Sequence, residues 1–293
     1  MTRTMQSWPR CSYVAQAAGD PLEGSAPPAE RWLLIEHRGP WGRIALTQSG
    51  LDPRAVAALS EWADAEHARV VLVRRPGRRS PATPARRWFR VDSRQGYESI
   101  RGGEFVADAE LAAAATAAGE AVHGPLHLVC AHGRHDPCCA VRGRLLAAAL
   151  AAADPERTWE CSHVGGCRFA PVTVLLPHGY VLGHVPVPDA VRAVRDYRAG
   201  IIGPRWVRGR SSLPPAAQAA QHHARAATGA TGTDALRVVA VTPDSGGGWL
   251  VTLAEPDCTV LLRERRLDPH RPLTCAATSP GWMRVFDLVE LRT

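Results

Sequence analysis

Residues 126–143, LHLVCAHGRHDPCCAVRG, contain the signals from which the fold of this chain can be predicted. The apolar run at 126–130 predicts a short buried strand that ends on a cysteine. Asp136 followed by Pro137 is typical of a helix start, because the carboxylate caps free backbone N–H groups and proline fits the first turn. We therefore expect a helix from 137 to about 153, directly after the strand.

The segments that follow continue the alternation of strand and helix. They predict an extended segment, a β-hairpin and a closing helix, at residues 158–163, 172–185 and 188–199. The order from 126 to 199 is then strand, helix, strand, strand, helix. This is the order of the C-terminal part of a thioredoxin-like arrangement.

The chain on the N-terminal side predicts a further α/β part. Strands are expected at 31–37, 70–73 and 87–91, and helices at 53–68 and 107–122. Residues 1–30 are rich in Pro, Gly and Ala without a period and predict a poorly ordered arm. No internal sequence repeat is visible.

Beyond residue 204 the pattern changes to one Ala-rich helix followed by strands. The helix is expected from Pro214-Pro215 to about 227, and the strands at 235–241, 248–254, 258–264 and 283–291. The predicted division of the chain is a flexible arm, an N-terminal α/β part, a thioredoxin-like domain and a small β-rich appendage, at residues 1–30, 31–122, 123–204 and 205–293. The fold class is therefore α/β.

Composition limits the class of protein. The 293 residues are 45% hydrophobic and 22% charged, which is ordinary for a globular chain. No apolar run is long enough to span a bilayer, and the N-terminus has no secretory signal pattern, so we expect a cytoplasmic protein without membrane partners.

The formal charge of +7 comes from 35 basic residues, all of them arginine. No nucleic-acid-binding module is recognisable, so we do not expect a nucleic-acid partner. The densest basic stretch, Arg74–Arg90, is instead expected to be a solvated loop or to dock an acidic protein.

Eight cysteines carry most of the functional information, and five of them fall between residues 130 and 167. In a chain without a secretory signal, such clustering indicates metal or redox chemistry. The core pattern is Cys130 and Cys139 in one loop, and His163 and Cys167 in a second. Thiolate and imidazole are ligands of both zinc and iron–sulfur clusters, and the residues alone leave both open. Gly165 and Gly166 would let the backbone approach an inorganic core.

These motifs resemble those of the sucrase/ferredoxin-like family. The resemblance rests on Cys130 to Gly143, on Trp159-Glu-Cys-Ser-His163-Val-Gly-Gly-Cys167-Arg-Phe-Ala170 and on Pro177-His-Gly179, and it covers roughly residues 30–200. It implies a thioredoxin-like ferredoxin with a [2Fe–2S] cluster. Characterised members use two cysteines and a His-x-Gly-Gly-His motif, whereas this chain has Cys167 at the final position.

Carried over to this sequence, the resemblance implies the cluster ligands Cys130, Cys139, His163 and Cys167. It favours Cys139 over its neighbour Cys138. Around this set, Gly165, Gly166, Arg168 and His132 are expected next to the ligands. The other cysteines, Cys11, Cys161, Cys258 and Cys275, are expected to be structural thiols. With three thiolates and one imidazole, the redox potential should lie between those of four-cysteine and two-histidine sites.

The resulting functional prediction is a one-electron carrier, or an electron-transfer component without substrate turnover of its own. No Gly-x-Gly-x-x-Gly fingerprint for NAD or FAD is present, so a separate reductase with an acidic docking face is the expected partner. Electron uptake is expected to be coupled to a proton at the free nitrogen of His163.

Three other functions are compatible with parts of the sequence. A structural zinc protein would use the same three cysteines and one histidine. The family name suggests a sugar hydrolase, for which Asp136 and Glu160 are candidate carboxylates without a matching motif. A thiol–disulfide enzyme would fit the thioredoxin-like order, but the chain lacks the expected Cys-x-x-Cys.

Overall fold

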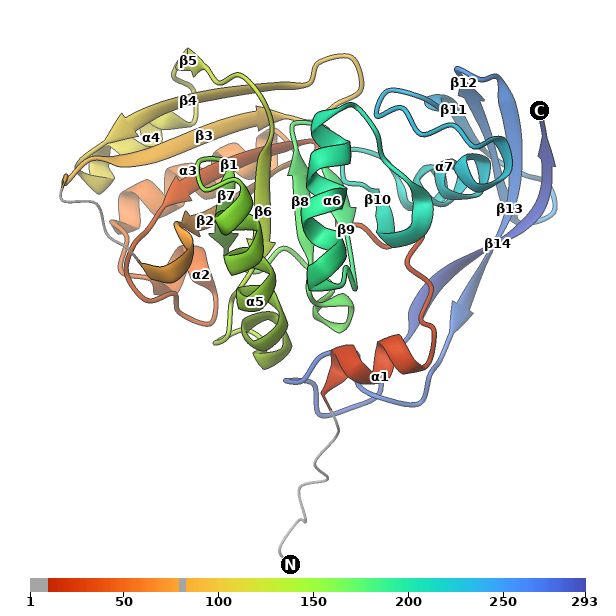
Figure 1. Ribbon diagram of the computed structural model, residues 1–293, viewed down its shortest axis with the longest axis horizontal. Helices are drawn as coiled ribbons and strands as arrows, with labels where there is room; N and C mark the ends of the chain where they lie inside the picture. Colours follow the sequence, from red (N-terminus) through yellow and green to blue (C-terminus); the bar gives the residue numbers. More distant parts are fainter. Residues whose placement is uncertain (1–9, 79–82) are drawn as a thin grey trace, which may run out of the picture.

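The computed structural model describes residues 10–78 and 83–293 (Figure 1). It contains a ten-stranded mixed sheet of order β10-β9-β8-β6-β7-β2-β1-β3-β4-β5 and a four-stranded antiparallel sheet of order β11-β12-β13-β14. The predicted α/β class, with a separate β-rich C-terminal part, is confirmed.

The thioredoxin-like half of the large sheet has the predicted order of elements. Strand β6 pairs parallel with β7 and antiparallel with β8, and β8 pairs antiparallel with β9. Two helices, α5 and α6, pack against one another beside these strands. The bounds are β6 Leu126–Cys130, α5 Pro137–Ala153, β7 Thr158–Cys161, β8 Thr173–Leu176, β9 Tyr180–Leu182 and α6 Val187–Arg198.

The N-terminal half repeats this topology. Strand β1 pairs parallel with β2 and antiparallel with β3, and β3 pairs antiparallel with β4. The bounds are β1 Arg31–Glu36, α2 Ala45–Gln48, α3 Pro53–Ala65, β2 Ala68–Arg74, β3 Arg86–Asp92, β4 Ser99–Phe105, α4 Leu111–Ala114 and β5 Glu120–Ala121. The large sheet is therefore built from two strand–helix–strand–strand units, a structural repeat that has no counterpart in the residue pattern.

Antiparallel pairing of β2 with β7 joins the two units, with Val73 opposite Cys161. Strand alternation then separates the cores. Leu33 and Ile35 of β1 pack in the cluster that contains Leu59 of α3. Their neighbours Trp32 and Leu34 belong to a central hydrophobic cluster that is shared with the second unit. This cluster also contains all five cysteines between residues 130 and 167. The cysteine-bearing loops thus lie in the common core of both units.

The predicted helix over 107–122 is largely wrong. Only residues 108–110 and 111–114 are helical, and the chain then turns to form β5. Gly119 has a φ of +59°, and a Cβ at that position would lie 2.7 Å from the Trp88 ring, so the backbone leaves the helical conformation here. Strand β4 was missed because its Gly102-Gly103 pair has low strand propensity; Gly103 is required beneath Trp88.

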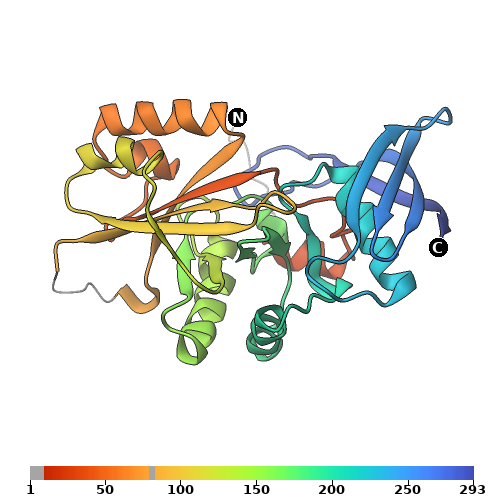
Figure 2. The ribbon, with the colours of Figure 1, turned by 90° about the horizontal axis from the view of Figure 1, so that it is seen from above.

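The C-terminal part packs one helix on the four-stranded sheet. Helix α7 contributes small residues, such as Ala217 and Ala220, to a core with Val260 and Leu262. This unit stands at the end of the molecule opposite the N-terminal half (Figure 2). The bounds are β10 Val207–Arg210, α7 Pro215–Thr228, β11 Arg237–Pro243, β12 Gly248–Ala254, β13 Cys258–Leu267 and β14 Met283–Arg292.

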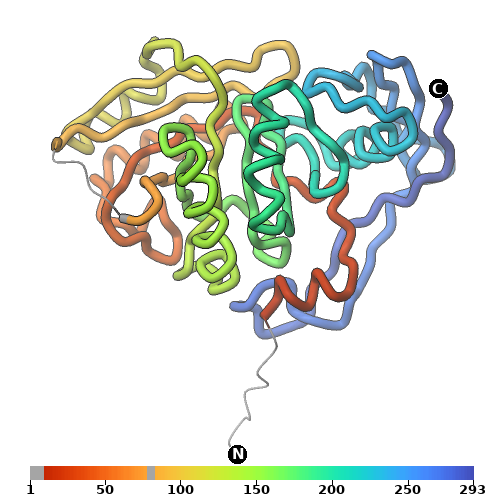
Figure 3. The backbone as a smooth tube through the Cα atoms, viewed as in Figure 1, coloured from red at the N-terminus to blue at the C-terminus, as the bar shows by residue number. Residues whose placement is uncertain are grey.

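The prediction of a poorly ordered arm over 1–30 is wrong for the part that the structure describes. Cys11–Ala17 form helix α1, in which Cys11, Ser12 and Ala15 are buried. The long connection between β13 and β14 runs back to α1, so these two segments lie side by side next to the thioredoxin-like half (Figure 3). Packing against distant residues orders a segment whose own composition does not favour structure.

Among the described residues, no helix combines the length and the apolar character needed to cross a bilayer.

Candidate metal centre

The first cysteine loop is shaped by the start of α5. Asp136 caps this helix, as predicted, by accepting a hydrogen bond of 2.8 Å from the backbone N–H of Cys138. Gly143, one helical turn after Cys139, packs directly on the end of β6. A Cβ at Gly143 would lie 2.0 Å from the carbonyl oxygen of Cys130, so only glycine allows this approach. The close contact sets Cys130 and Cys139 side by side.

The second loop follows β7 and carries His163 and Cys167. Gly165 and Gly166 both have positive φ values, +94° and +76°, and a short 3₁₀ turn, Cys167–Phe169, begins directly after them. We expected these glycines to make room for an inorganic core. The close neighbours of their Cβ positions are instead Pro27 and Arg208, so the glycines are required by backbone conformation and by packing away from the ligands.

The four predicted ligand side chains lie together in the central core. Cys167 Sγ is 3.4 Å from His163 Nδ1. Cys139 lies close enough to Cys130 and Cys167, and His163 close enough to Cys130, for each to shift the pKa of the other. The four side chains form a closed ring of contacts in which the three thiols are 1% exposed and the imidazole is half-buried.

The three thiols have different pKa values because they lie close to one another. Hydrogen bonds with Cys139 lower the pKa of Cys130 to about 6 and that of Cys167 to about 3, against the opposing effect of burial. The same hydrogen bonds, together with burial, raise the pKa of Cys139. Burial alone would lower the pKa of His163, but hydrogen bonds to Cys130 and Cys167 outweigh it and raise the pKa to about 9. A cation bound in the ring would therefore favour deprotonation of Cys139 and His163.

Two further histidines border this ring. His132 Nδ1 accepts a hydrogen bond of 3.2 Å from the backbone N–H of His163, which leaves Nε2 to donate to the carbonyl oxygen of Gly42 at 2.7 Å. Both nitrogens of His132 are thus occupied, and this residue positions the second loop. His135 stacks on His163 with ring centroids 3.6 Å apart and lies beside Cys167. The two stacked imidazoles form the partly exposed edge of the site.

Three arginines supply positive charge around the thiols. Arg208, which is 2% exposed, donates to the carbonyl oxygen of Gly165 and interacts electrostatically with Cys167 and Cys139. Arg69 interacts in the same way with Cys130 and Cys161, and Arg168 with Cys167 and Cys11. Only Arg168 was predicted; it also approaches Asp20, with Nε 3.6 Å from the carboxylate. Arg69 and Arg208 lie outside the motifs, so no local signal marked them.

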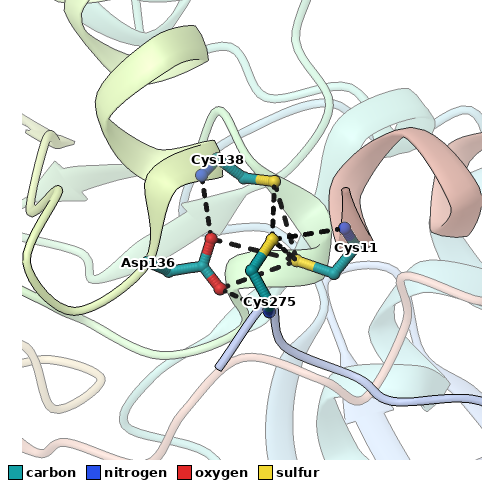
Figure 4. Close-up of side chains that lie close together, drawn as sticks. All are labelled: Cys11, Asp136, Cys138 and Cys275. Atoms are coloured by element: carbon teal, nitrogen blue, oxygen red, sulfur yellow. Dashed lines mark hydrogen bonds between the residues drawn. The ribbon is translucent and has the colours of Figure 1, made fainter. Parts of the chain in front are cut away.

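A second group of thiols was not expected. Cys11 and Cys275, predicted to be structural thiols, meet Cys138 and Asp136 beside the start of α5 (Figure 4). The sulfur of Cys138 lies 3.3 Å from that of Cys275 and 3.7 Å from that of Cys11. The grouping of Cys11 and Cys275 with Cys138 and Asp136 was not predicted. Because the three residues lie far apart in the sequence, no spacing motif could have revealed their convergence.

The remaining cysteines and the candidate carboxylates have structural surroundings. Cys161 is buried next to Cys130 on the neighbouring strand, and Cys258 lies in the core of the C-terminal sheet. Glu160 is paired with Arg74 at 2.8 Å. Asp136 accepts backbone hydrogen bonds from Cys138 and Cys275. Neither carboxylate of the predicted hydrolase pair is free to act on a sugar.

The basic stretch Arg74–Arg90 is largely used within the fold, apart from residues 79–82, which lie outside the described residues. Arg75 donates to the carbonyl oxygens of Pro155 and Glu156 and packs over Trp159. Arg86 pairs with Asp108 at 2.7 Å. A different basic surface lies nearer the thiols: Arg134 and Arg144 line a hollow of about 260 Å³ beside His132.

Comparison with known proteins gives one match. The family model for sucrase/ferredoxin-like proteins matches residues 22–209, which include both strand–helix–strand–strand units and all four predicted ligands. No curated protein and no solved structure matches the chain.

Proposed function

Because this chain belongs to the sucrase/ferredoxin-like family, we propose that it is a one-electron transfer protein with a [2Fe–2S] cluster held by Cys130, Cys139, His163 and Cys167. The observation that carries the proposal is the closed ring of contacts between these four side chains. Cys130 ends β6 and Cys139 lies in the first turn of α5, whereas His163 and Cys167 follow β7.

The donor set fits an iron–sulfur cluster. Thiolates and imidazole are the protein ligands of such clusters. Cys139 lies beside Cys130 and Cys167, and negative charge on either raises its pKa, so a bound cation would favour the fully ionised set. Arg69, Arg168 and Arg208 offset part of the negative charge that remains when the site is filled.

The cluster, when bound, supplies reversible one-electron redox chemistry. The protein contributes ligation, exclusion of water and a route to the surface. Burial of the three thiols keeps solvent away, whereas His163 and His135 reach the surface. His132 holds the backbone of His163 in place. Proton uptake at His163, expected from the sequence, belongs to the same proposal.

An acidic redox protein is the proposed partner. Arg134 and Arg144 are exposed on the loop and helix that carry Cys130 and Cys139, and they line the hollow beside His132. Positive charge at this position would steer an acidic reductase toward the exposed edge of the site. The arginines of β2 and β3 are less suited, because their guanidinium groups bind other parts of the chain.

Anaerobic reconstitution of the full chain with iron and sulfide tests the proposal. We expect equal amounts of iron and acid-labile sulfide, visible absorption that bleaches on reduction, and an EPR signal of the reduced state. Zinc in place of iron, without labile sulfide, would instead support the structural zinc function. Turnover of sucrose by cluster-free protein would support a hydrolase.

A further inference from the structure

We propose that Cys11, Cys138 and Cys275, together with Asp136, form a second metal site that binds Zn²⁺. The four side chains come from three separate parts of the chain (Figure 4). Cys11 begins α1, Asp136 and Cys138 lie at the start of α5, and Cys275 lies in the connection between β13 and β14. This site shares no residue with the proposed cluster ligands and does not depend on the cluster.

The three sulfurs have the spacing of a tetrahedral thiolate site. Their separations are 3.3 Å for Cys138–Cys275, 3.5 Å for Cys275–Cys11 and 3.7 Å for Cys11–Cys138. With Zn–S bonds of about 2.3 Å, sulfurs at the corners of a tetrahedron lie roughly 3.8 Å apart. A small outward movement of the side chains would therefore admit the ion.

Asp136 supplies an oxygen at the fourth side of this group. Its Oδ2 lies 3.7 Å from Cys11 Sγ, and one ligand atom from each of the four residues falls within 4.8 Å of all the others. The backbone N–H groups of Cys138 and Cys275 donate to its two oxygens at 2.8 and 2.9 Å and fix the carboxylate plane. Each oxygen keeps a further lone pair, so Asp136 or a water molecule it orients can complete four-coordination.

Charge balance favours a cation in this group. Asp136 is fully buried, and no arginine or histidine of the described chain lies within ion-pair distance of it. Three thiols surround it, two of them fully or almost fully buried. Zn²⁺ would displace the thiol protons to solvent and neutralise most of the resulting thiolate charge. Arg142 and Arg168, which interact electrostatically with Cys138 and Cys11, would offset the remainder.

A disulfide accounts for less of this arrangement. It would join two of the three sulfurs and leave the third, together with the carboxylate, without a partner. Zinc uses all four donors and matches their chemistry, because it prefers thiolates and accepts carboxylate oxygen. The ion would also cross-link distant segments of the chain: its ligands are separated by 127, 137 and 264 positions in the sequence. Such long closed loops gain the most from a cross-link.

The site has a consequence for the neighbouring ring of thiols. Zinc would hold Cys138 toward Cys11 and Cys275, which leaves Cys139 alone to face Cys130 and Cys167. Binding at the second site would thus order the first turn of α5 and prevent Cys138 from competing for iron.

Metal analysis of the full-length reconstituted protein tests this inference. We expect zinc in a one-to-one ratio with the chain, in addition to iron and labile sulfide. Cys11→Ser and Cys275→Ser should lose the zinc and keep the iron and sulfide. Cys258→Ser, a buried cysteine in the C-terminal sheet, is the matched control and should keep both metals. Cys139→Ser should lose the iron and keep the zinc, which separates failure of this site from failure of the proposed function.

A second measurement uses unmodified protein and therefore does not depend on whether the variants fold. Unmodified protein that retains its iron and sulfide, stripped of zinc under reducing conditions, should bind Co²⁺ with the absorption of a tetrahedral thiolate complex. Chymotrypsin should cleave more rapidly after Leu273, in the β13–β14 connection, after zinc is removed. Absence of zinc and of Co²⁺ binding would overturn the inference, as would zinc retained in Cys275→Ser. A disulfide between Cys138 and Cys275 in protein isolated under reducing conditions would also overturn it.

Discussion

Cys138 and Cys139 are adjacent in the sequence but take part in different groups of thiols. Cys138 Sγ lies 3.3 Å from Cys275 Sγ, whereas Cys139 contacts Cys130 and Cys167 in the central core. Successive residues of a helix point about 100° apart, so the first turn of α5 can serve two sites at once. Asp136 lies between them, because its carboxylate is within 4.8 Å of sulfurs from both groups.

This relationship gives opposite expectations for two neighbouring substitutions. Cys139→Ser should lose or destabilise the iron–sulfur cluster, because it removes a donor from the ring. Cys138→Ser should retain iron and sulfide and lose only the zinc. Iron, sulfide and zinc analysis of both variants after identical reconstitution checks the prediction. Normal iron in Cys139→Ser, with loss of iron in Cys138→Ser, would reverse the assignment.

Replacement of Arg208 should lower the redox potential. Its buried guanidinium interacts with Cys167 and Cys139, and a positive charge favours the reduced, more negative state of the site. Arg208→Met should shift the potential downward by tens of millivolts, as expected for a unit charge at an effective dielectric constant of about 20. Redox titration followed by EPR measures this. Arg225→Met, a buried arginine of α7, is the control; an equal shift there would show that the effect is not local.

Gly143→Ala should destabilise the protein. The added methyl group would lie 2.0 Å from the carbonyl oxygen of Cys130, and a backbone atom at the end of a central strand cannot easily give way. We expect a loss of stability at the upper end of the roughly 1–3 kcal/mol typical of overpacking, together with weaker cluster retention. Denaturant unfolding compares this variant with Gly203→Ala, where a Cβ meets nothing within 4 Å. Equal stability of the two variants would contradict the packing argument.

Acid should destabilise the fold partly through His127. This residue of β6 is fully buried, neither ring nitrogen has a hydrogen-bond partner among the described residues, and burial lowers its pKa to about 4. The unfolded chain, with a histidine pKa near 6.5, therefore binds more protons between these two values. Stability falls as the pH decreases through this window, by about 3 kcal/mol for this group at pH 4 and below.

His127→Gln should remove this contribution. Unfolding measured between pH 7 and pH 4 should show a smaller loss of stability in the variant than in the unmodified protein. His270→Gln, at an exposed histidine, is the control and should leave the pH dependence unchanged. An unaltered acid response of His127→Gln would mean that other groups govern acid unfolding.

Electron transfer from an acidic partner should depend on Arg134 and Arg144. The double substitution Arg134→Glu and Arg144→Glu should slow the bimolecular reaction and weaken its salt dependence, since steering by exposed charges is screened beyond about 8 Å at physiological ionic strength. Stopped-flow reduction at several salt concentrations measures both effects. Arg54→Glu, on the exposed surface of α3, is the control. Equal rates in the double variant and this control would place docking elsewhere.

The sequence by itself determined the strands and helices from 126 to 199, and it identified the four candidate ligands. Their signals are local: Asp136-Pro137 caps a helix, and Cys130 ends an apolar strand. Tertiary structure decided the features that depend on distant contacts. The repeated unit at 31–105 follows from strand pairing rather than from residue identity, and Gly102-Gly103 forms a strand because Trp88 packs on it. The meeting of Cys11 and Cys275 with Cys138 depends on α1 and the β13–β14 connection packing beside the start of α5. A local pattern encodes backbone preference, whereas contacts between residues more than 100 positions apart arise only when the cores assemble.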